Sequence, residues 1–237
     1  MRIAIIDKNT PDIAERELRR RGFYTIRTIP SGKIPAPLNS HPDMLIFKCG
    51  DTVVTSADYV EEACGFFEEL SSLSTLKFRA DACVLGAKYP HDCIYNALII
   101  GDKAFLKTDT VSPAVIEALR GTGKKIIHVN QGYPACTVLP LGDGAAITAD
   151  EGMARVLTSE GIKVTLIENG DIALPPYEYG FIGGAAGVLG DTVYFLGNPK
   201  THKCAEKILR AIEDAGLRSV SLFDGGLIDL GRIIFAE

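Results

Sequence analysis

The sequence predicts an α/β fold: a five-fold pseudosymmetric α/β propeller of strand–strand–helix–strand (ββαβ) units. Three observations lead to this prediction. A Gly-Asp turn recurs four times along the chain, a helix follows each turn, and the segments left over at the two ends assemble a fifth unit.

The recurring turns begin at Gly50, Gly101, Gly142 and Gly190, which are 51, 41 and 48 residues apart. Spacings of this size are typical of propeller-like arrays. Each turn lies between two apolar runs rich in β-branched residues, the usual pattern of a β-hairpin. We therefore predict one hairpin at each turn, with the four turns on one rim of a ring.

The helices are predicted from their start and stop signals. Proline follows a capping residue at Thr10, Ser112 and Asn198, and Asp150 begins a further helix. A glycine ends each of four helices and a strand follows it. These pairs are Gly22 with 23–29, Gly121 with 124–129, Gly161 with 163–168, and Gly216 with 217–223. The third strand of the first unit is expected within 76–85.

The fifth unit is divided between the two ends of the chain. The end supplies a strand within 227–236, and the beginning supplies a strand at 1–7, a helix at 10–21 and a strand at 23–29. A chain that takes its first strand from its last residues closes a ring and leaves no open sheet edge. We therefore expect residues 233–236 to pair with 2–6 in a single domain spanning 1–237.

The composition indicates a globular protein, with 237 residues, 46% apolar and 23% charged. A net charge of −5 gives no general attraction to nucleic acid or anionic membrane. We find no membrane-spanning run or signal peptide, and we expect a cytoplasmic protein. The six cysteines form no C-x-x-C pair, so we expect free thiols rather than disulfides or a zinc site. No other metal and no cofactor are expected. A small-molecule ligand is expected, and the oligomeric state is left open.

Five such units around a pseudo-fivefold axis resemble the pentein superfamily, over the whole chain. That superfamily includes arginine deiminase, dimethylarginine dimethylaminohydrolase, the amidinotransferases and the non-catalytic eukaryotic initiation factor six. The stretches NQGYPAC at 130–136, YGFIGG at 179–184 and DLG at 229–231 also look like an uncharacterised bacterial family of similar length.

The resemblance implies a possible chemistry. Catalytic penteins carry a nucleophilic cysteine in the last unit, with a His-x-acid pair and further acids from earlier units, and they form a thiolate-bound adduct on a guanidinium carbon. Here the last unit, 229–237, contains no cysteine. A nucleophile in this chain would have to come from another unit.

Polar residues of the first hairpin strands are expected to converge on the axis of the ring. Nucleophilic catalysis needs a thiolate, a base and an orienting acid, and carboxylates also pair well with a cationic guanidinium. The catalytic candidates are Cys136, His41, His91, Asp43 and Asp92. The substrate-binding candidates are Asn96, Tyr179, Asp229, Gly183 and Gly184.

Cys136 is the preferred nucleophile because it follows Tyr133-Pro134 at a predicted hairpin start. The alternative is a small buried hydrophobe, which is the commoner role of a free cysteine. Cys93 is second. The alternation of a strand would put His91 and Cys93 on one face and Asp92 on the other.

His41-Pro42-Asp43 is the nearest match to the His-x-acid pattern, the alternative being a histidine at a strand start beside a turn proline. The glycines at 180, 183, 184 and 187 suggest a nucleotide loop, but such a loop needs a helix directly after it, and a strand and a turn follow here. We interpret them as keeping the first strand thin where it crowds the axis or approaches a ligand.

Two functions remain open. The first is a cysteine-dependent hydrolase or transferase acting on a guanidino compound, which the convergent His, Asp and Cys residues favour. The second is a non-catalytic ring that binds a small molecule or a macromolecular partner, which the missing C-terminal cysteine favours. A polar pocket containing a thiol at the centre of the ring would support the enzyme, and an apolar plug would support the binder.

Overall fold

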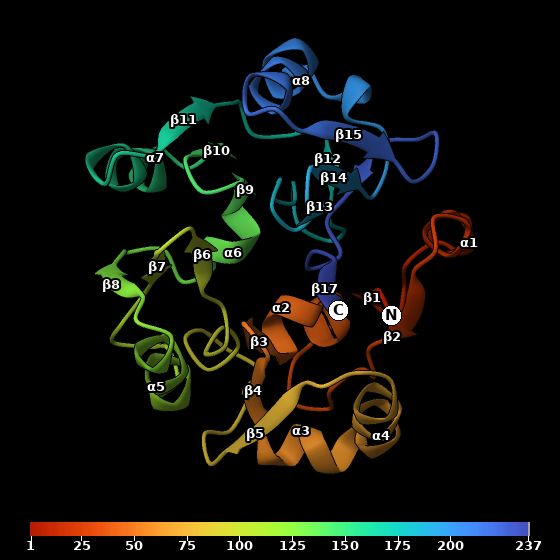
Figure 1. Ribbon diagram of the computed structural model, residues 1–237, viewed down its shortest axis with the longest axis vertical. Helices are drawn as coiled ribbons and strands as arrows, with labels where there is room; N and C mark the ends of the chain where they lie inside the picture. The colour runs from red at the N-terminus through yellow and green to blue at the C-terminus, as the bar shows by residue number, and fades with distance from the viewer. Residues whose placement is uncertain (237) are drawn as a thin grey trace.

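The structure, a computed structural model, describes residues 1–236. Five three-stranded sheets surround a common centre, with the longer helices on the outside (Figure 1). In every one of these sheets the inner strand is antiparallel to the middle strand, and the middle strand is parallel to the outer strand. The predicted strand–strand–helix–strand connectivity is therefore present.

The strands have the following bounds. The five sheets are β17 (Ile234–Ala236), β1 (Ile3–Ile6) and β2 (Tyr24–Arg27); β3 (Phe47–Cys49), β4 (Thr52–Ser56) and β5 (Lys77–Asp81); β6 (Leu98–Ile100), β7 (Lys103–Leu106) and β8 (Lys125–His128); β9 (Val138–Leu141), β10 (Ala145–Thr148) and β11 (Lys163–Leu166); and β13 (Ala186–Leu189), β14 (Thr192–Phe195) and β15 (Arg218–Ser221). A separate parallel pair joins β12 (Ile172–Ala173), which follows β11 in the chain, to β16 (Leu227–Ile228), which follows β15.

All four predicted hairpin turns are confirmed. Each turn connects an antiparallel inner and middle strand, and its glycine has a positive φ of 58–68°. Residues that carry a side chain rarely adopt this left-handed backbone conformation, which explains why glycine recurs at 50, 101, 142 and 190. The third strand of the first unit, β5, lies inside the expected window.

The two ends of the chain are neighbours, as predicted. Ile3 is opposite Ala236 and Ile5 is opposite Ile234 in the antiparallel pair of β1 and β17. Figure 1 shows the two termini side by side near the centre of the molecule. The first strand of the fifth unit therefore comes from the last residues of the chain.

The helices are α1 (Asp12–Arg20), α3 (Ala57–Glu62), α4 (Cys64–Leu73), α5 (Pro113–Gly121), α7 (Glu151–Ser159) and α8 (Ala205–Asp214), with single turns α2 (Pro42–Leu45) and α6 (Pro134–Thr137) and 3-10 turns at Leu38–Ser40 and Pro199–Thr201. The longer helices bury one face each. For example, Ile208 and Ile212 of α8 pack with Val193 and Phe195 of β14. This apolar contact holds the helix against its sheet.

The predicted caps are confirmed at three positions, where Ser112, Asp150 and Asn198 accept a hydrogen bond from a backbone N–H at the start of the following turn. Thr10 does not cap α1, because the helix begins later, after Pro11, and the Thr10 hydroxyl is buried without a partner. Asn198 caps only a 3-10 turn, and α8 starts further on. Gly121 is the last residue of α5, and it is Gly123 that has the positive φ.

The segments before the inner strands differ from the prediction. We expected the candidate site residues on the first hairpin strands, but they lie in single helical turns and bends. Proline begins both α2 and α6, which favours a helical turn over an extended strand. The hydroxyls of Thr55 and Thr148 donate to the last carbonyls of these turns, on Leu45 and Thr137. The matching bonds indicate that α2 and α6 are equivalent parts of two repeats.

These segments are joined to one another around the centre by a circuit of hydrogen bonds. Each hydrogen bond links the segment before one inner strand to the segment before the inner strand of the neighbouring unit. The bonds run from Asp43 N to Gly231 O (3.3 Å), Arg232 N to Gly184 O (2.8 Å), Gly184 N to Cys136 O (3.0 Å), Ala135 N to Asn96 Oδ1 (2.8 Å) and Asn96 Nδ2 to Asp43 O (3.4 Å). The circuit returns to its starting residue and fixes the five segments relative to one another.

Candidate active site

The thiol of Cys136 lies in this central circuit. It donates a hydrogen bond of 2.8 Å to Oδ2 of Asp43, and Nδ2 of Asn96 donates to the sulfur at 3.1 Å. Cys136 comes from α6 and Asp43 from α2, so two equivalent turns supply the pair. The structure therefore brings together a predicted nucleophile, a predicted acid and a predicted binding residue.

Cys136 faces a cavity of about 220 Å³, which we call the thiol cavity. The walls come from segments that precede the inner strands, so the cavity lies at the end of the ring where those strands begin. Its surface is largely apolar and aromatic, from residues such as Leu38, Met44, Leu174 and Phe181, and it also includes His41, Asp92, Tyr133, Tyr179 and Asp229. A pocket of this composition fits a small polar ligand that has a planar, cationic part.

The thiol is held neutral by its surroundings. Burial raises the pKa of Cys136 well above its usual value, and the negative charges of Asp43 and Asp229 raise it further. Burial likewise raises the pKa of Asp43, against the hydrogen bond from Cys136 and the charge of Arg232. The proton between sulfur and carboxylate therefore stays on sulfur in the unliganded protein.

Asp229 is the second buried acid of the site. Burial raises its pKa to about 7, although its oxygens accept hydrogen bonds from the backbone N–H groups of Phe181 and Gly231. A Cβ on Gly184 would collide with this carboxylate, and one on Gly183 would collide with the backbone carbonyls of α6. These two glycines therefore permit a close approach of chain segments, one of the two roles expected from the sequence.

Asp92 supplies a carboxylate that is only half satisfied. Its Oδ2 accepts a hydrogen bond of 2.8 Å from the hydroxyl of Tyr133, whereas its buried Oδ1 has no partner among residues 1–236. Tyr179 lies half-exposed on the cavity wall, with its ring 6.4 Å from that of Phe181. The cavity thus offers one unpaired acceptor beside aromatic rings.

The histidines lie differently from one another. His41 lines the thiol cavity, and burial lowers its pKa to about 4, so it is neutral near pH 7. Its Nε2 is buried without a partner, and Cys136 has no hydrogen bond to a described histidine. His91 is exposed and Cys93 is buried because residues 89–95 form turns rather than a strand. The predicted sharing of one strand face by His91 and Cys93 is therefore wrong.

In the central circuit, the side-chain amide of Asn96 makes the hydrogen bonds that backbone groups make in the other units. Its side chain accepts from Ala135 N and donates to Asp43 O as well as to the thiol. The position of Asn96 therefore fixes the distance between the two turns that carry Cys136 and Asp43.

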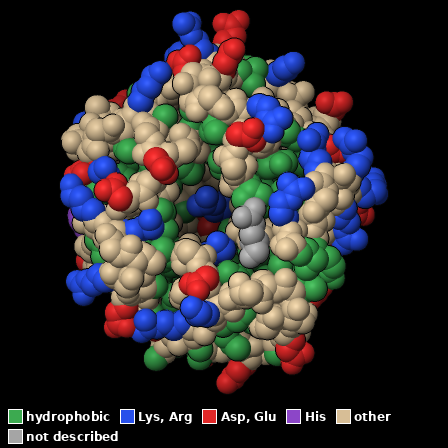
Figure 2. All heavy atoms as spheres, in the orientation of Figure 1, with side chains coloured by type: hydrophobic (Ala, Val, Ile, Leu, Met, Phe, Trp, Pro, Cys, Tyr) green, Lys and Arg blue, Asp and Glu red, His purple; other side chains and the backbone are tan. Residues whose placement is uncertain are grey.

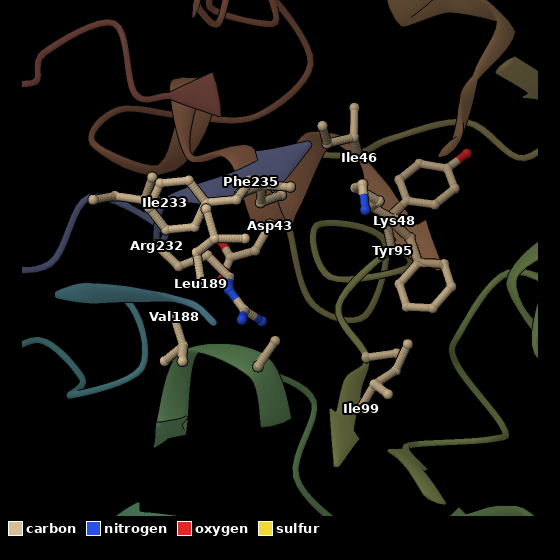
Figure 3. A pocket seen from close by; sticks show the side chains of 14 residues that line it. Asp43, Ile46, Lys48, Tyr95, Ile99, Val188, Leu189, Arg232, Ile233 and Phe235 are labelled. Carbon is tan, nitrogen blue, oxygen red and sulfur yellow. The ribbon is translucent and has the colours of Figure 1, made fainter. Parts of the chain in front are cut away.

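A second central cavity, of about 310 Å³, lies among the inner strands themselves (Figure 3). We call it the axial cavity. Asp43 lines it, whereas Cys136 lines the thiol cavity, so their hydrogen bond separates the two spaces. Arg232 also lines it, and the sequence analysis missed this residue. Its position just before β17 could have identified it, because Asp43 and Cys136 lie just before the inner strands of their own units.

Within residues 1–236, no group of three or more His, Cys, Asp or Glu side chains is arranged to hold a metal ion. No helix in that range is long and apolar enough to cross a bilayer.

Comparison with solved structures defines the class of protein: the chain has the pentein fold. It resembles the amidinotransferase SxtG of the saxitoxin biosynthetic pathway of Microseira wollei at a TM-score of 0.54 and 14% identity, covering 90% of this chain and 76% of that one. The inosamine-phosphate amidinotransferase StrB1 of Streptomyces griseus gives a TM-score of 0.56 and 15% identity, covering 92% and 78%. DDAH from Pseudomonas aeruginosa, in complex with citrulline, gives 0.57 and 10%, covering 94% and 95%.

The particular family is shown by the sequence. The chain belongs to DUF6873, a family of unknown function that matches residues 5–234. None of the curated proteins matches the sequence significantly. At identities of 10–15% the solved structures establish the shared fold alone.

Proposed function

We propose that the protein is a cysteine-dependent hydrolase or transferase that acts on a guanidino compound bound in the thiol cavity. The observation that carries the proposal is the hydrogen bond between Cys136 and Asp43 at the wall of a cavity that contains further carboxylates. The amidinotransferases and the DDAH that share the fold support the same substrate class.

Recognition of a guanidinium group follows from the composition of the thiol cavity. Oδ1 of Asp92 accepts one N–H of the ligand, because it is buried and has no partner in the described chain. The ring of Tyr179 or Phe181 stacks on the planar cation. Asp229 contributes negative charge as its proton is lost, and the arriving cation favours that loss.

Activation of the thiol requires the substrate. A guanidinium beside Cys136 lowers the pKa of the thiol, because a nearby cation stabilises the thiolate. Asp43 then takes the proton directly, since its Oδ2 already accepts the hydrogen bond from the sulfur and burial has raised its pKa. In this arrangement Asp43, and not a histidine, is the base.

The reaction then proceeds through a covalent adduct. The Cys136 thiolate forms an S–C bond to the guanidinium carbon, and the C–N bond to the leaving amine breaks. The amine leaves with the proton that Asp43 holds. Water, in a hydrolase, or a second amine, in a transferase, attacks the same carbon, the S–C bond breaks, and the attacking group's proton passes through Asp43 to the sulfur.

We also infer that the five sheets are the blades of one pseudo-fivefold propeller and that residues 1–237 form a single domain. The shared connectivity of the sheets and the hydrogen-bonded circuit around the centre support this inference. A cytoplasmic location, one small-molecule ligand, and no nucleic acid or membrane partner remain proposals.

Turnover of a guanidino panel tests the proposal. The wild-type protein is incubated with L-arginine, agmatine and N-methylguanidine, with and without glycine as an amine acceptor, and the ureido or amidino products are measured by mass spectrometry. We expect one product with the wild-type protein and none with Cys136→Ser. Cys93→Ser is the matched control, because Cys93 is also buried but does not line the thiol cavity.

A non-catalytic ring that binds a small molecule is the second candidate. The specific observation in its favour is the state of Cys136, whose pKa is raised by burial and which has no histidine partner among the described residues. This candidate predicts saturable binding of a guanidino compound by calorimetry, no product, and unchanged affinity in Cys136→Ser.

A further inference from the structure

We propose that the axial cavity is a binding site for a small organic carboxylate, which Arg232 recognises through its guanidinium. This site lies on the other side of the Cys136–Asp43 hydrogen bond from the thiol cavity, and binding there does not require the chemistry proposed for Cys136.

The first observation is a guanidinium nitrogen that lacks a hydrogen-bond acceptor. The Nε of Arg232 is buried and has no hydrogen-bond partner among the described residues, although the charge of Asp43 acts on the guanidinium. Figure 3 shows its nitrogens extending into the interior of the cavity. A buried donor without an acceptor is costly, and a bound carboxylate would supply that acceptor.

The second observation is backbone strain at the same residue. Arg232 has a φ of +61°, a left-handed conformation that costs a side-chain-bearing residue about 1 kcal/mol or more. Glycine would adopt it freely, as the preceding Gly231 does at +65°. The backbone at this position directs the Arg232 side chain into the axial cavity, so the strain accompanies a functional placement.

The lining of the axial cavity identifies the ligand class. A planar guanidinium binds a carboxylate through two parallel hydrogen bonds. Arg232 is the cation whose nitrogens enter the cavity, and the cavity wall also carries the carboxylate of Asp43. Figure 2 shows a hollow at the centre of the molecule with both basic and acidic side chains inside it. The remaining wall is largely apolar, from residues such as Ile99, Val188, Leu189 and Ile234, and fits a short hydrocarbon tail.

Calorimetric titration of the full-length protein with butyrate tests the proposal, in a buffer free of other carboxylates. We expect saturable one-to-one binding. Arg232→Met should weaken it about tenfold or more, the effect of losing hydrogen bonds to a charged group. Arg155→Met is the matched control, because this arginine is exposed on α7, and it should leave the affinity unchanged. Absence of binding to the wild-type protein, or equal binding by Arg232→Met, would overturn the proposal.

Two further variants define the site. Arg232→Gly removes the cation and the strain together, so it should raise Tm without ligand and abolish butyrate binding; a lower Tm would contradict the argument from strain. Val188→Phe narrows the apolar wall, so it should bind acetate and lose butyrate, and retained butyrate binding would exclude this cavity. Tighter binding of inorganic phosphate than of butyrate would overturn the assignment to a carboxylate.

Discussion

The thiol of Cys136 donates a hydrogen bond of 2.8 Å to Oδ2 of Asp43, a residue 93 positions earlier in the chain. The two side chains meet because equivalent helical turns, α6 and α2, begin at prolines and end directly before inner strands. The repeat thus places a thiol directly against a carboxylate, without a histidine between them.

Replacing Asp43, the proposed base, should change the labelling rate of the thiol and the turnover rate in opposite directions. In Asp43→Asn the negative charge beside the sulfur is lost, so the pKa of Cys136 falls and the thiol should react faster with iodoacetamide at pH 8, about tenfold per unit of pKa. Turnover should nevertheless fall by a factor of about 10² to 10⁴, because no group accepts the proton. Labelling and product formation are measured on the same sample. Slower labelling together with retained turnover would remove Asp43 from the role of base.

Replacing His41, in contrast to replacing Asp43, should not change the labelling of Cys136. His41→Gln keeps a polar side chain in the thiol cavity and, since His41 has no hydrogen bond to the sulfur, should leave the pH dependence of Cys136 labelling unchanged. The labelling rate is measured between pH 6 and pH 9. A change of tenfold or more in the labelling rate at any pH in this range would indicate that His41 acts on the thiol.

The acid Asp229 should make stability depend on pH. Its folded pKa of about 7 lies above the unfolded value near 3.9, so the folded state holds the proton over this interval. The stabilisation is fully present at low pH and decreases as pH rises, by on the order of 1.4 kcal/mol per unit. Asp229→Asn should remove this slope, as urea unfolding at pH 5, 6, 7 and 8 would measure. His41 contributes the opposite slope equally to both proteins, so the difference between them isolates Asp229. Parallel curves would contradict the assignment.

Close packing at the centre is tested by Gly184→Ala. The added Cβ would collide with the buried carboxylate of Asp229, so we expect a loss of about 1–3 kcal/mol in the free energy of unfolding. Gly144→Ala is the control, because a Cβ there meets nothing and the change should stay within about 0.5 kcal/mol. Equal stability of the two variants would contradict the described contact.

The closing strand is tested by deletion of residues 234–237. Without β17, strand β1 has an unpaired edge, and Phe23 loses the ring of Phe235 that lies 5.0 Å away. Unpaired edges promote association between chains, so we expect oligomers and aggregates on size-exclusion chromatography. A monomer with the Tm of the full chain would show that the pairing is dispensable.

The sequence predicted the repeat accurately because glycines with a positive φ and capped helices are local signals. The split fifth unit was predictable as well, since the chain offered no other partner for β1. The one-turn helices α2 and α6 were missed, because the three residues that follow each proline resemble the start of a strand.

The site was predicted in part. Cys136, Asp43 and Asn96 meet as members of corresponding segments, which an alignment of the repeats could anticipate. No described histidine is hydrogen-bonded to the thiol, and this depends on how single helical turns are rotated. Arg232 lines the axial cavity, and this depends on its own left-handed backbone conformation. Neither feature can be predicted from the composition or from the spacing of residues in the sequence.

The central claim is that Cys136 attacks a guanidino compound, and trapping of the adduct tests it most directly. The protein is mixed with each compound of the panel, quenched in acid within seconds, and digested for peptide mass spectrometry. We predict that one compound adds its amidino group to the peptide that contains Cys136, and that Cys136→Ser carries no such mass. An unmodified Cys136 under conditions in which calorimetry detects bound guanidino compound would contradict the claim and leave the protein as a binding ring.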